Sequence, residues 1–154
     1  MSIIQVKHIE SNCRSRFVTL IDTGDLHSLA AEDKDTNFLT RALAAFAIAS
    51  AAKIDDTLAA ASVVDEAKDD GIDAFYYDRV EHVCYLAQSK WSKNGNATID
   101  VGSVLKFIQG INHFLEAKLN LLGPKLQAKK QEIQDVLAGR GGNPSIKDRF
   151  ANQV

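Results

Sequence analysis

Apolar residues recur every three or four positions in several segments of the chain, which is the spacing of an α-helix with one side buried. Residues 37–53 are the clearest case, because alanine, the residue with the highest helix propensity, dominates them. The opposite side of this helix is also apolar, so most of its faces should be covered. A second apolar stripe predicts a helix over about 101–119, and it consists of Val101, Val104, Leu105, Ile108, Ile111 and Leu115.

The segments between these two helices predict a pair of strands. Residues 72–78 and 83–91 are rich in β-branched and aromatic residues, and the short connection between them favours an antiparallel hairpin. Less regular periodicity predicts further helices at 3–22, 55–64 and 124–138, with a loop at 23–36. Residues 1–138 should therefore form a single domain, followed by a flexible tail at 139–154.

Composition narrows the class of protein. The 154 residues are 45% hydrophobic and 25% charged, as in an ordinary soluble protein. The net charge of -2 excludes a protein that coats nucleic acid by bulk charge, so any nucleic-acid contact needs a local patch. Cys13 and Cys84 have no metal-ligand spacing and are expected to be free thiols in the cytoplasm. The apolar stretch 42–52 is too short to span a bilayer, so no membrane partner is expected.

The predicted hairpin gathers polar groups that suit a divalent cation. If its turn centres near Val80, opposed residue numbers sum to about 160 or 161, which places Asp73 opposite Ala87 or Gln88. Lys90 lies two residues past Gln88, on the same face of that strand. A carboxylate and an amide oxygen are ligands for a hard cation, and a lysine can stabilise charge on a phosphate. The alternative from spacing alone is a solvated strand end.

These residues also resemble a known family. The stretch DDGIDAFYYD followed by LAQSKW resembles the core of the Mrr-like branch of PD-(D/E)xK nucleases, in which a G-I-D strand pairs with a Q-x-K strand. Within that branch the chain is most similar to the N-terminal region of abortive-infection phage-resistance proteins, through FLTRALAAFAIA and VGSVLKFIQGI as well. The resemblance covers about residues 37 to 115, the larger part of the chain.

The resemblance implies a fold, an activity and a set of site residues. The fold would be α/β with a restriction-endonuclease-like core, a small mixed sheet with a central antiparallel hairpin flanked by helices. The activity would be Mg- or Mn-dependent cleavage of phosphodiester bonds in DNA, as an endonuclease in defence against phage. Asp73, Gln88 and Lys90 would be the catalytic residues, and Asp73, Gln88 and Asp70 would hold the metal.

The chain departs from the family pattern at two points. Such folds often add an acidic ligand from the helix before the first core strand, and residues 37–53 contain no acid; the candidates to replace it are Asp35, Asp55, Asp56 and Asp65. Residues 139–154 also do not read as the further apolar strand that usually follows. An alternative is therefore a catalytically inert domain that binds nucleic acid or a protein partner, and a third is a helical oligomerisation module.

Two residues beyond the motif are candidates for nucleic-acid contact. Trp91 could stack on a base and Lys93 could contact a phosphate, whereas packing and solvation are the alternatives. Lys125, Lys129 and Lys130 form the densest basic patch, which reads more simply as a solvated helix face. Cleavage of both strands of a duplex would favour a homodimer.

Overall fold

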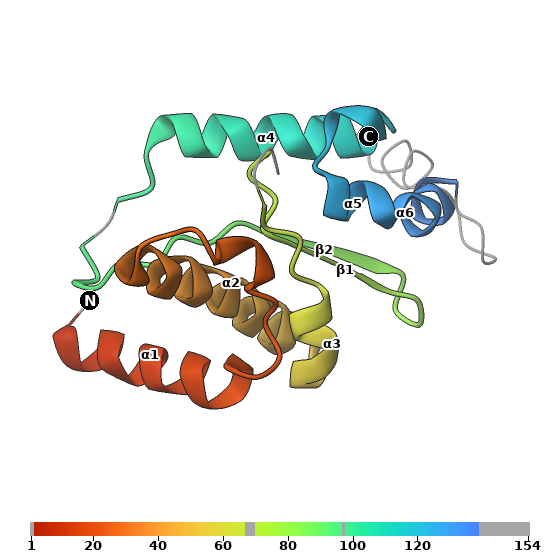
Figure 1. The fold of residues 1–154 in the computed structure, drawn as a ribbon. Coiled ribbons are helices and arrows are strands. Elements are labelled where there is room, and N and C mark those ends of the chain that lie inside the picture. The colour runs from red at the N-terminus through yellow and green to blue at the C-terminus, as the bar shows by residue number, and fades with distance from the viewer. Residues whose placement is uncertain (1, 67–69, 97, 139–154) are drawn as a thin grey trace.

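The computed structural model of the chain describes residues 2–66, 70–96 and 98–138, and a short hairpin lies at its centre (Figure 1). Strands β1 (Ala74–Asp78) and β2 (Val83–Ala87) pair antiparallel, with Ala74 opposite Ala87. Numbers of paired residues sum to 161, so the predicted register is confirmed. The flexible tail predicted at 139–154 lies outside the described residues.

Helices cover both faces of the hairpin, which gives a mixed α/β fold as expected. The helices are α1 (Ile3–Phe17), α2 (Ala31–Ala52), α3 (Asp56–Ala61), α4 (Val101–Leu115), α5 (Pro124–Ala128) and α6 (Lys130–Leu137), with single turns η1 (Gly24–Leu26) and η2 (Leu119–Leu121). A small mixed sheet was expected, but within the described residues the sheet consists of one antiparallel pair of strands. One further bridge joins Val63 to Ala74, so the segment before the first strand extends the sheet on its other edge.

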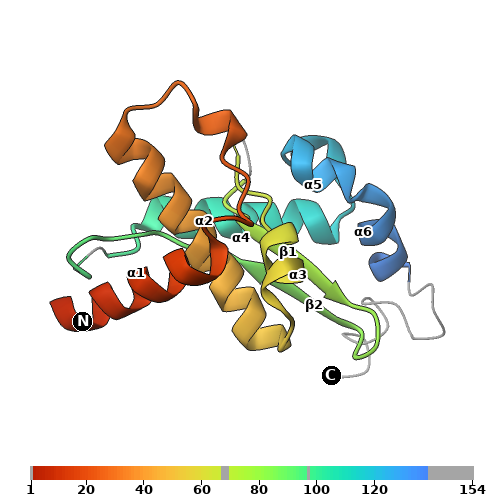
Figure 2. The same cartoon turned by 60° about the horizontal axis from the view of Figure 1, so that its bottom comes forward.

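Alternation along the strands divides the core into two sides. Ala74, Tyr76, Tyr85 and Ala87 pack towards α2, against Ala44 and Ile48. The alternate strand residues pack towards α4, α5 and α6; they are Phe75, Tyr77, Cys84 and Leu86. On this side the ring centroids of Phe75 and Phe114 lie 5.5 Å apart. Helix α1 adds an outer layer on α2, and Figure 2 shows the two helices crossing. The predicted burial of 37–53 is confirmed, because the hairpin, α1 and α3 together cover most of α2.

Several predicted boundaries were wrong. Helix α2 begins at Ala31, inside the expected loop 23–36. The carboxylates of Glu32 and Asp33 in its first turn stabilise this start through their interaction with the helix dipole. The helix expected at 3–22 ends at Phe17, the one expected at 55–64 covers only α3, and the one expected at 124–138 is interrupted at Lys129. The strand expected at 83–91 ends at Ala87, so residues 88–91 lie beyond the ladder.

A glycine on helix α4 allows the helix to pack closely against the turn at residues 70–71. Gly110 is buried, and a Cβ at this residue would lie 2.5 Å from the carbonyl oxygen of Asp70. Gly71, the next residue after Asp70, has φ +75°, a conformation that glycine adopts without strain. The turn at 70–71 and α4 therefore approach at a distance that only a glycine on the helix permits.

We predict that Gly110→Ala destabilises the fold by about 1–3 kcal/mol, because overpacking outweighs the gain in helix propensity. Gly102→Ala is the matched control on the same helix, since a Cβ there would meet only the side chain of Asp100. It should be neutral or mildly stabilising. Thermal and urea unfolding followed by circular dichroism measure both variants, and equal effects at Gly110 and Gly102 would contradict the close approach.

Candidate metal and nucleic-acid site

Asp73 is held by backbone hydrogen bonds on both of its sides. Its N–H donates to Ala87 O at 2.9 Å, and its carbonyl oxygen accepts from the N–H groups of Val64 and Asp65. The residue is 6% exposed, and Oδ2 accepts a hydrogen bond of 2.5 Å from the backbone N–H of Ser89. The carboxylate is therefore fixed at the end of the hairpin and directed towards the strand-end residues that follow β2.

Gln88 and Lys90 continue the alternation of β2 on the side that faces α4. Gln88 Nε2 donates to Ser103 O at 3.2 Å, and Lys90 Nζ lies 3.4 Å from Asp100 Oδ2. Asp100 is the N-cap of α4, and Ser103 lies in its first turn. The ladder ends at the pair Ala74–Ala87, and the Asp73 N–H bonds to Ala87 O. The Asp73 carboxylate contacts Ser89, the residue between Gln88 and Lys90.

Ser89 and Trp91 point to the other side, towards α1 and α2. The Ser89 hydroxyl donates to Thr40 O at 2.8 Å and lies 3.3 Å from Asp73 Oδ2. The backbone N–H of Trp91 donates to the hydroxyl of Thr40 at 3.3 Å, and Trp91 is 8% exposed within the α1–α2 core. Trp91 thus takes the packing role that was the alternative to base stacking, and burial keeps its ring from a base in this conformation.

Lys93 and Asp70 have partners away from Asp73. Lys93 Nζ forms an exposed ion pair of 2.6 Å with Glu32 Oε1, and this hydrogen bond raises the pKa of Lys93. Asp70 Oδ2 lies 3.1 Å from His113 Nδ1 on α4, and Asp70 has a positive φ of 52°. The structure therefore directs the Asp70 carboxylate at α4 rather than along the hairpin.

The four acids proposed to replace the missing helix ligand all have other roles. Asp35 binds Arg14, which lowers the pKa of Asp35, and Asp56 binds Arg16 with the same effect. The Asp55 carboxylate caps α3. Asp65 binds Arg41, as described next. In the described parts of the chain no group of three or more His, Cys, Asp or Glu side chains could hold a metal ion.

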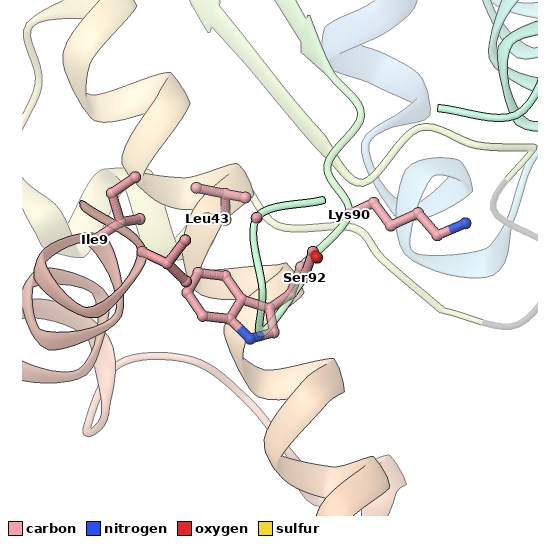
Figure 3. Close-up of a pocket in the computed structure, with 7 residues that line it drawn as sticks. Ile9, Leu43, Lys90 and Ser92 are labelled. Atoms are coloured by element: carbon pink, nitrogen blue, oxygen red, sulfur yellow. The ribbon is translucent and has the colours of Figure 1, made fainter. Parts of the chain in front are cut away.

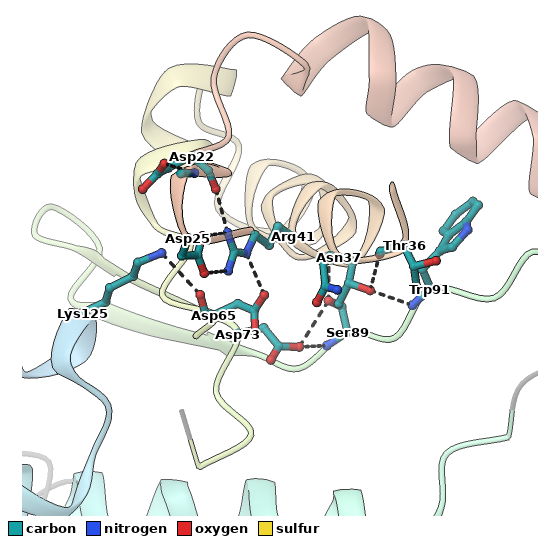
Figure 4. A network of polar contacts seen from close by, with 12 residues as sticks. Asp22, Asp25, Thr36, Asn37, Arg41, Asp65, Asp73, Ser89, Trp91 and Lys125 are labelled. Atoms are coloured by element: carbon teal, nitrogen blue, oxygen red, sulfur yellow. Dashed lines mark hydrogen bonds and ion pairs between the residues drawn. The ribbon is translucent and has the colours of Figure 1, made fainter. Parts of the chain in front are cut away.

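Arg41 is the central residue that the sequence analysis missed (Figure 4). Its side chain is 2% exposed on α2, and its guanidinium donates to both carboxylate oxygens of Asp25, at 2.7 and 2.6 Å. It also donates to Asp65 Oδ2 at 2.8 Å and to Asp22 O at 2.8 Å. The signal in the sequence was a single charged residue within the apolar stretch 38–52, because a buried arginine must be paired.

Two half-open cavities flank Lys90. One of about 200 Å³ lies between α1, α2 and residues 90–95, and Figure 3 shows the Lys90 side chain extending away from Ile9 and Leu43. The other, of about 220 Å³, is lined by Gln88, Ser89 and Lys90 together with Leu43, Ala47, Thr98 and Ile99. The second cavity therefore gathers two of the three predicted motif residues, and Ser89 links it to Asp73.

The chain has no match among known families or proteins: no family model, no curated protein and no solved structure matches it. Within the described residues, no helix is long and apolar enough to cross a membrane. Functional interpretation therefore depends on the geometry of the residues.

The ion pair between Arg41 and Asp25 should make the free energy of unfolding depend on pH. Arg41 lowers the pKa of Asp25 to about 2, below the value of about 3.9 for an unfolded chain. The pair therefore stabilises the fold above the unfolded pKa, and this contribution is lost as the pH falls from about 4 through about 2. We predict that Asp25→Asn lowers the free energy of unfolding near neutral pH by on the order of 1 kcal/mol, since Asp25 is partly exposed and solvent screens the pair.

The difference between parent and variant should be constant from neutral pH to about 5 and should close between about 4 and 2. Urea unfolding at a series of pH values measures it. Glu81→Gln, at the exposed hairpin turn, removes the same charge without touching Arg41 and serves as the control. A difference that does not vary with pH would show that the charge of Asp25 is not what stabilises the pair.

Proposed function

We propose that this chain is a PD-(D/E)xK-type nuclease domain that hydrolyses phosphodiester bonds with Mg or Mn, acting on DNA in defence against phage. The supporting observation is that Gln88, Ser89 and Lys90 line one cavity, and that Asp73 Oδ2 accepts a hydrogen bond from the Ser89 N–H. The order of acid, amide and lysine along the hairpin is the order of the family motif. The substrate and the defence role rest on the sequence resemblance.

The donor set suits a cation that keeps much of its shell outside the protein. Mg²⁺ is commonly held by one or two carboxylates, with water and substrate phosphates completing its six oxygens. Asp73 would supply the carboxylate, and Gln88, whose Nε2 is engaged by Ser103, would present its Oε1. Two protein ligands imply weak binding of the ion until nucleic acid adds its phosphates. The ion, when bound, would polarise the phosphoryl oxygen and lower the pKa of an attacking water.

Lys90 would act on the phosphate. Its ammonium is more than half exposed, and the 3.4 Å pair with Asp100 is open to solvent, so a phosphate oxygen can compete for it. Hydrogen bonds from Ser103 lower the pKa of Asp100 to about 2, which keeps this carboxylate charged and Lys90 directed at the N-terminus of α4. In the transition state the ammonium would stabilise the negative charge that grows on the phosphate.

One observation favours the second candidate, a catalytically inert domain that binds nucleic acid or a protein. Asp73 is 6% exposed and already accepts a short hydrogen bond from the Ser89 N–H. Every candidate for a third acidic ligand is bound to an arginine or caps a helix. Metal binding would then require the Asp73 carboxylate to turn or to share its oxygens.

We predict that Lys90→Ala lowers cleavage by on the order of a hundredfold or more with the fold intact, because the side chain is exposed and leaves no cavity. Lys90→Arg should not restore activity, since a planar guanidinium is larger than an ammonium and would not place its charge at the same point. Lys7→Ala, an exposed lysine on α1, is the control. The assay uses plasmid, linear and single-stranded DNA with Mn or Mg, on proteins with matched melting temperatures.

Equal cleavage by parent and Lys90→Ala would show that Lys90 is not catalytic. If the parent itself does not cleave any of the three substrates, the result would favour the second candidate, the catalytically inert binding domain. Electrophoretic mobility shifts on the same three substrates would then show whether it binds nucleic acid.

A further inference from the structure

Helix α4 carries an apolar face that packs on nothing within the described part of the chain. Its buried side is formed by Gly110 and Phe114, with Phe107 beside them. The apolar stripe that identified this helix in the sequence lies on the opposite side. Val101, Leu105 and Ile108 on that side are 74%, 60% and 47% exposed. Figure 1 shows α4 along one edge of the molecule, with no other described element beyond it.

The exposed positions follow the spacing of a coiled-coil seam. Val101, Leu105, Ile108, Asn112 and Leu115 are separated by alternating steps of four and three residues, which is the heptad pattern of alternating a and d positions. Leu105 and Asn112 take the a position, and the other three take d. All five are exposed, and Val104 widens the apolar stripe on one side. None of the five carries a charge, so two such faces can meet without burying an ion.

Asn112 indicates which partner the α4 face would bind, and how the partner helix would be oriented. An asparagine in the middle of an apolar seam is costly against leucine or valine, because its amide would be buried without a partner. In a parallel pair of identical helices, a positions face each other, so Asn112 would meet Asn112 and the two amides could hydrogen-bond. An antiparallel pair centred on Ile108 would instead set Asn112 against Val104 and Leu105. Of these two arrangements, only the parallel one sets Asn112 against Asn112 and leaves the apolar residues facing one another.

The size of the face is compatible with a dimer. Its exposed side chains amount to several hundred Å² of apolar surface, at the upper end of what a monomer carries on one patch. With the polar side chains along the rim, two copies would bury on the order of 1,200 Å², the lower limit of stable interfaces. Helix α4 is about 22 Å long and already anchored to its own domain, so pairing does not have to order it.

We infer that α4 is a homodimerisation surface, on which two copies of the chain pair their α4 helices in parallel with Asn112 opposite Asn112. This assignment is independent of the proposed nuclease activity. The apolar faces of the alanine-rich α2 are covered within the chain, so they do not provide the interface.

Sedimentation equilibrium of the parent chain across the micromolar range tests the dimer. We expect a dimer that Leu105→Glu and Ile108→Glu each convert to a monomer. Val80→Glu makes the same change at the hairpin tip, where Val80 is also exposed, and should remain dimeric. A parent that stays monomeric at the highest concentration overturns the inference, as does a dimer that both glutamate variants leave intact. Circular dichroism confirms that each variant is folded.

Cross-linking tests the orientation and does not depend on a destabilising charge. Asn112→Cys should form a disulfide between two chains when oxidised glutathione is added, whereas Gln109→Cys, to the side of the seam, should not. Subtracting the reaction of the parent accounts for Cys13 and Cys84. Cross-linking through Ile108→Cys but not through Asn112→Cys would show antiparallel pairing and overturn the arrangement.

Discussion

The buried guanidinium of Arg41 is the constraint on which the arrangement of this chain depends. It joins helix α2 to the turn before it through Asp25 and Asp22, and to the segment before β1 through Asp65. The Asp65 N–H in turn donates to the carbonyl of Asp73, so the position of the proposed ligand follows from the arginine. The guanidinium itself is buried, and a buried charge is tolerated only where opposite charges and hydrogen bonds compensate for its lost hydration. The two carboxylates are what make the burial of Arg41 tolerable.

Local patterns in the sequence predict the hairpin and the main helices, but they do not predict what joins them. The register follows from a period of two and a short turn, so Asp73 could be placed at the end of the hairpin, next to Ala87. The role of Ser89 could not, because its backbone N–H reaches Asp73 only after β2 has ended at Ala87. Arg41 stands out in composition, yet its partners lie 16 and 24 residues away and depend on the tertiary fold. The stripe on α4 predicts a helix correctly, whereas the side that packs is chosen by Gly110 and Phe114.

The same ion pairs account for the unusual form of the candidate site. Arginines on α1 and α2 neutralise Asp35, Asp56 and Asp65, so the acids near the hairpin stabilise the fold rather than gather around a cation. What is left for chemistry is one fixed carboxylate, one amide and one exposed lysine. Such a set would depend on its substrate to complete the metal shell. An outward α4 face would add a second copy, and a dimer could present two such sites to one duplex.

The central claim is that Asp73 and Gln88 bind a divalent cation, and paramagnetic broadening by Mn²⁺ tests it most directly. In a two-dimensional amide NMR spectrum titrated with Mn²⁺, the account predicts early loss of the backbone signals of Asp73 and Ser89 and of the Gln88 side-chain amide. The signal of Glu81, at the far end of the hairpin, should persist, and Asp73→Asn should abolish the selective loss. Broadening that begins at Glu81 or other surface carboxylates, or that is unchanged in Asp73→Asn, would contradict the claim.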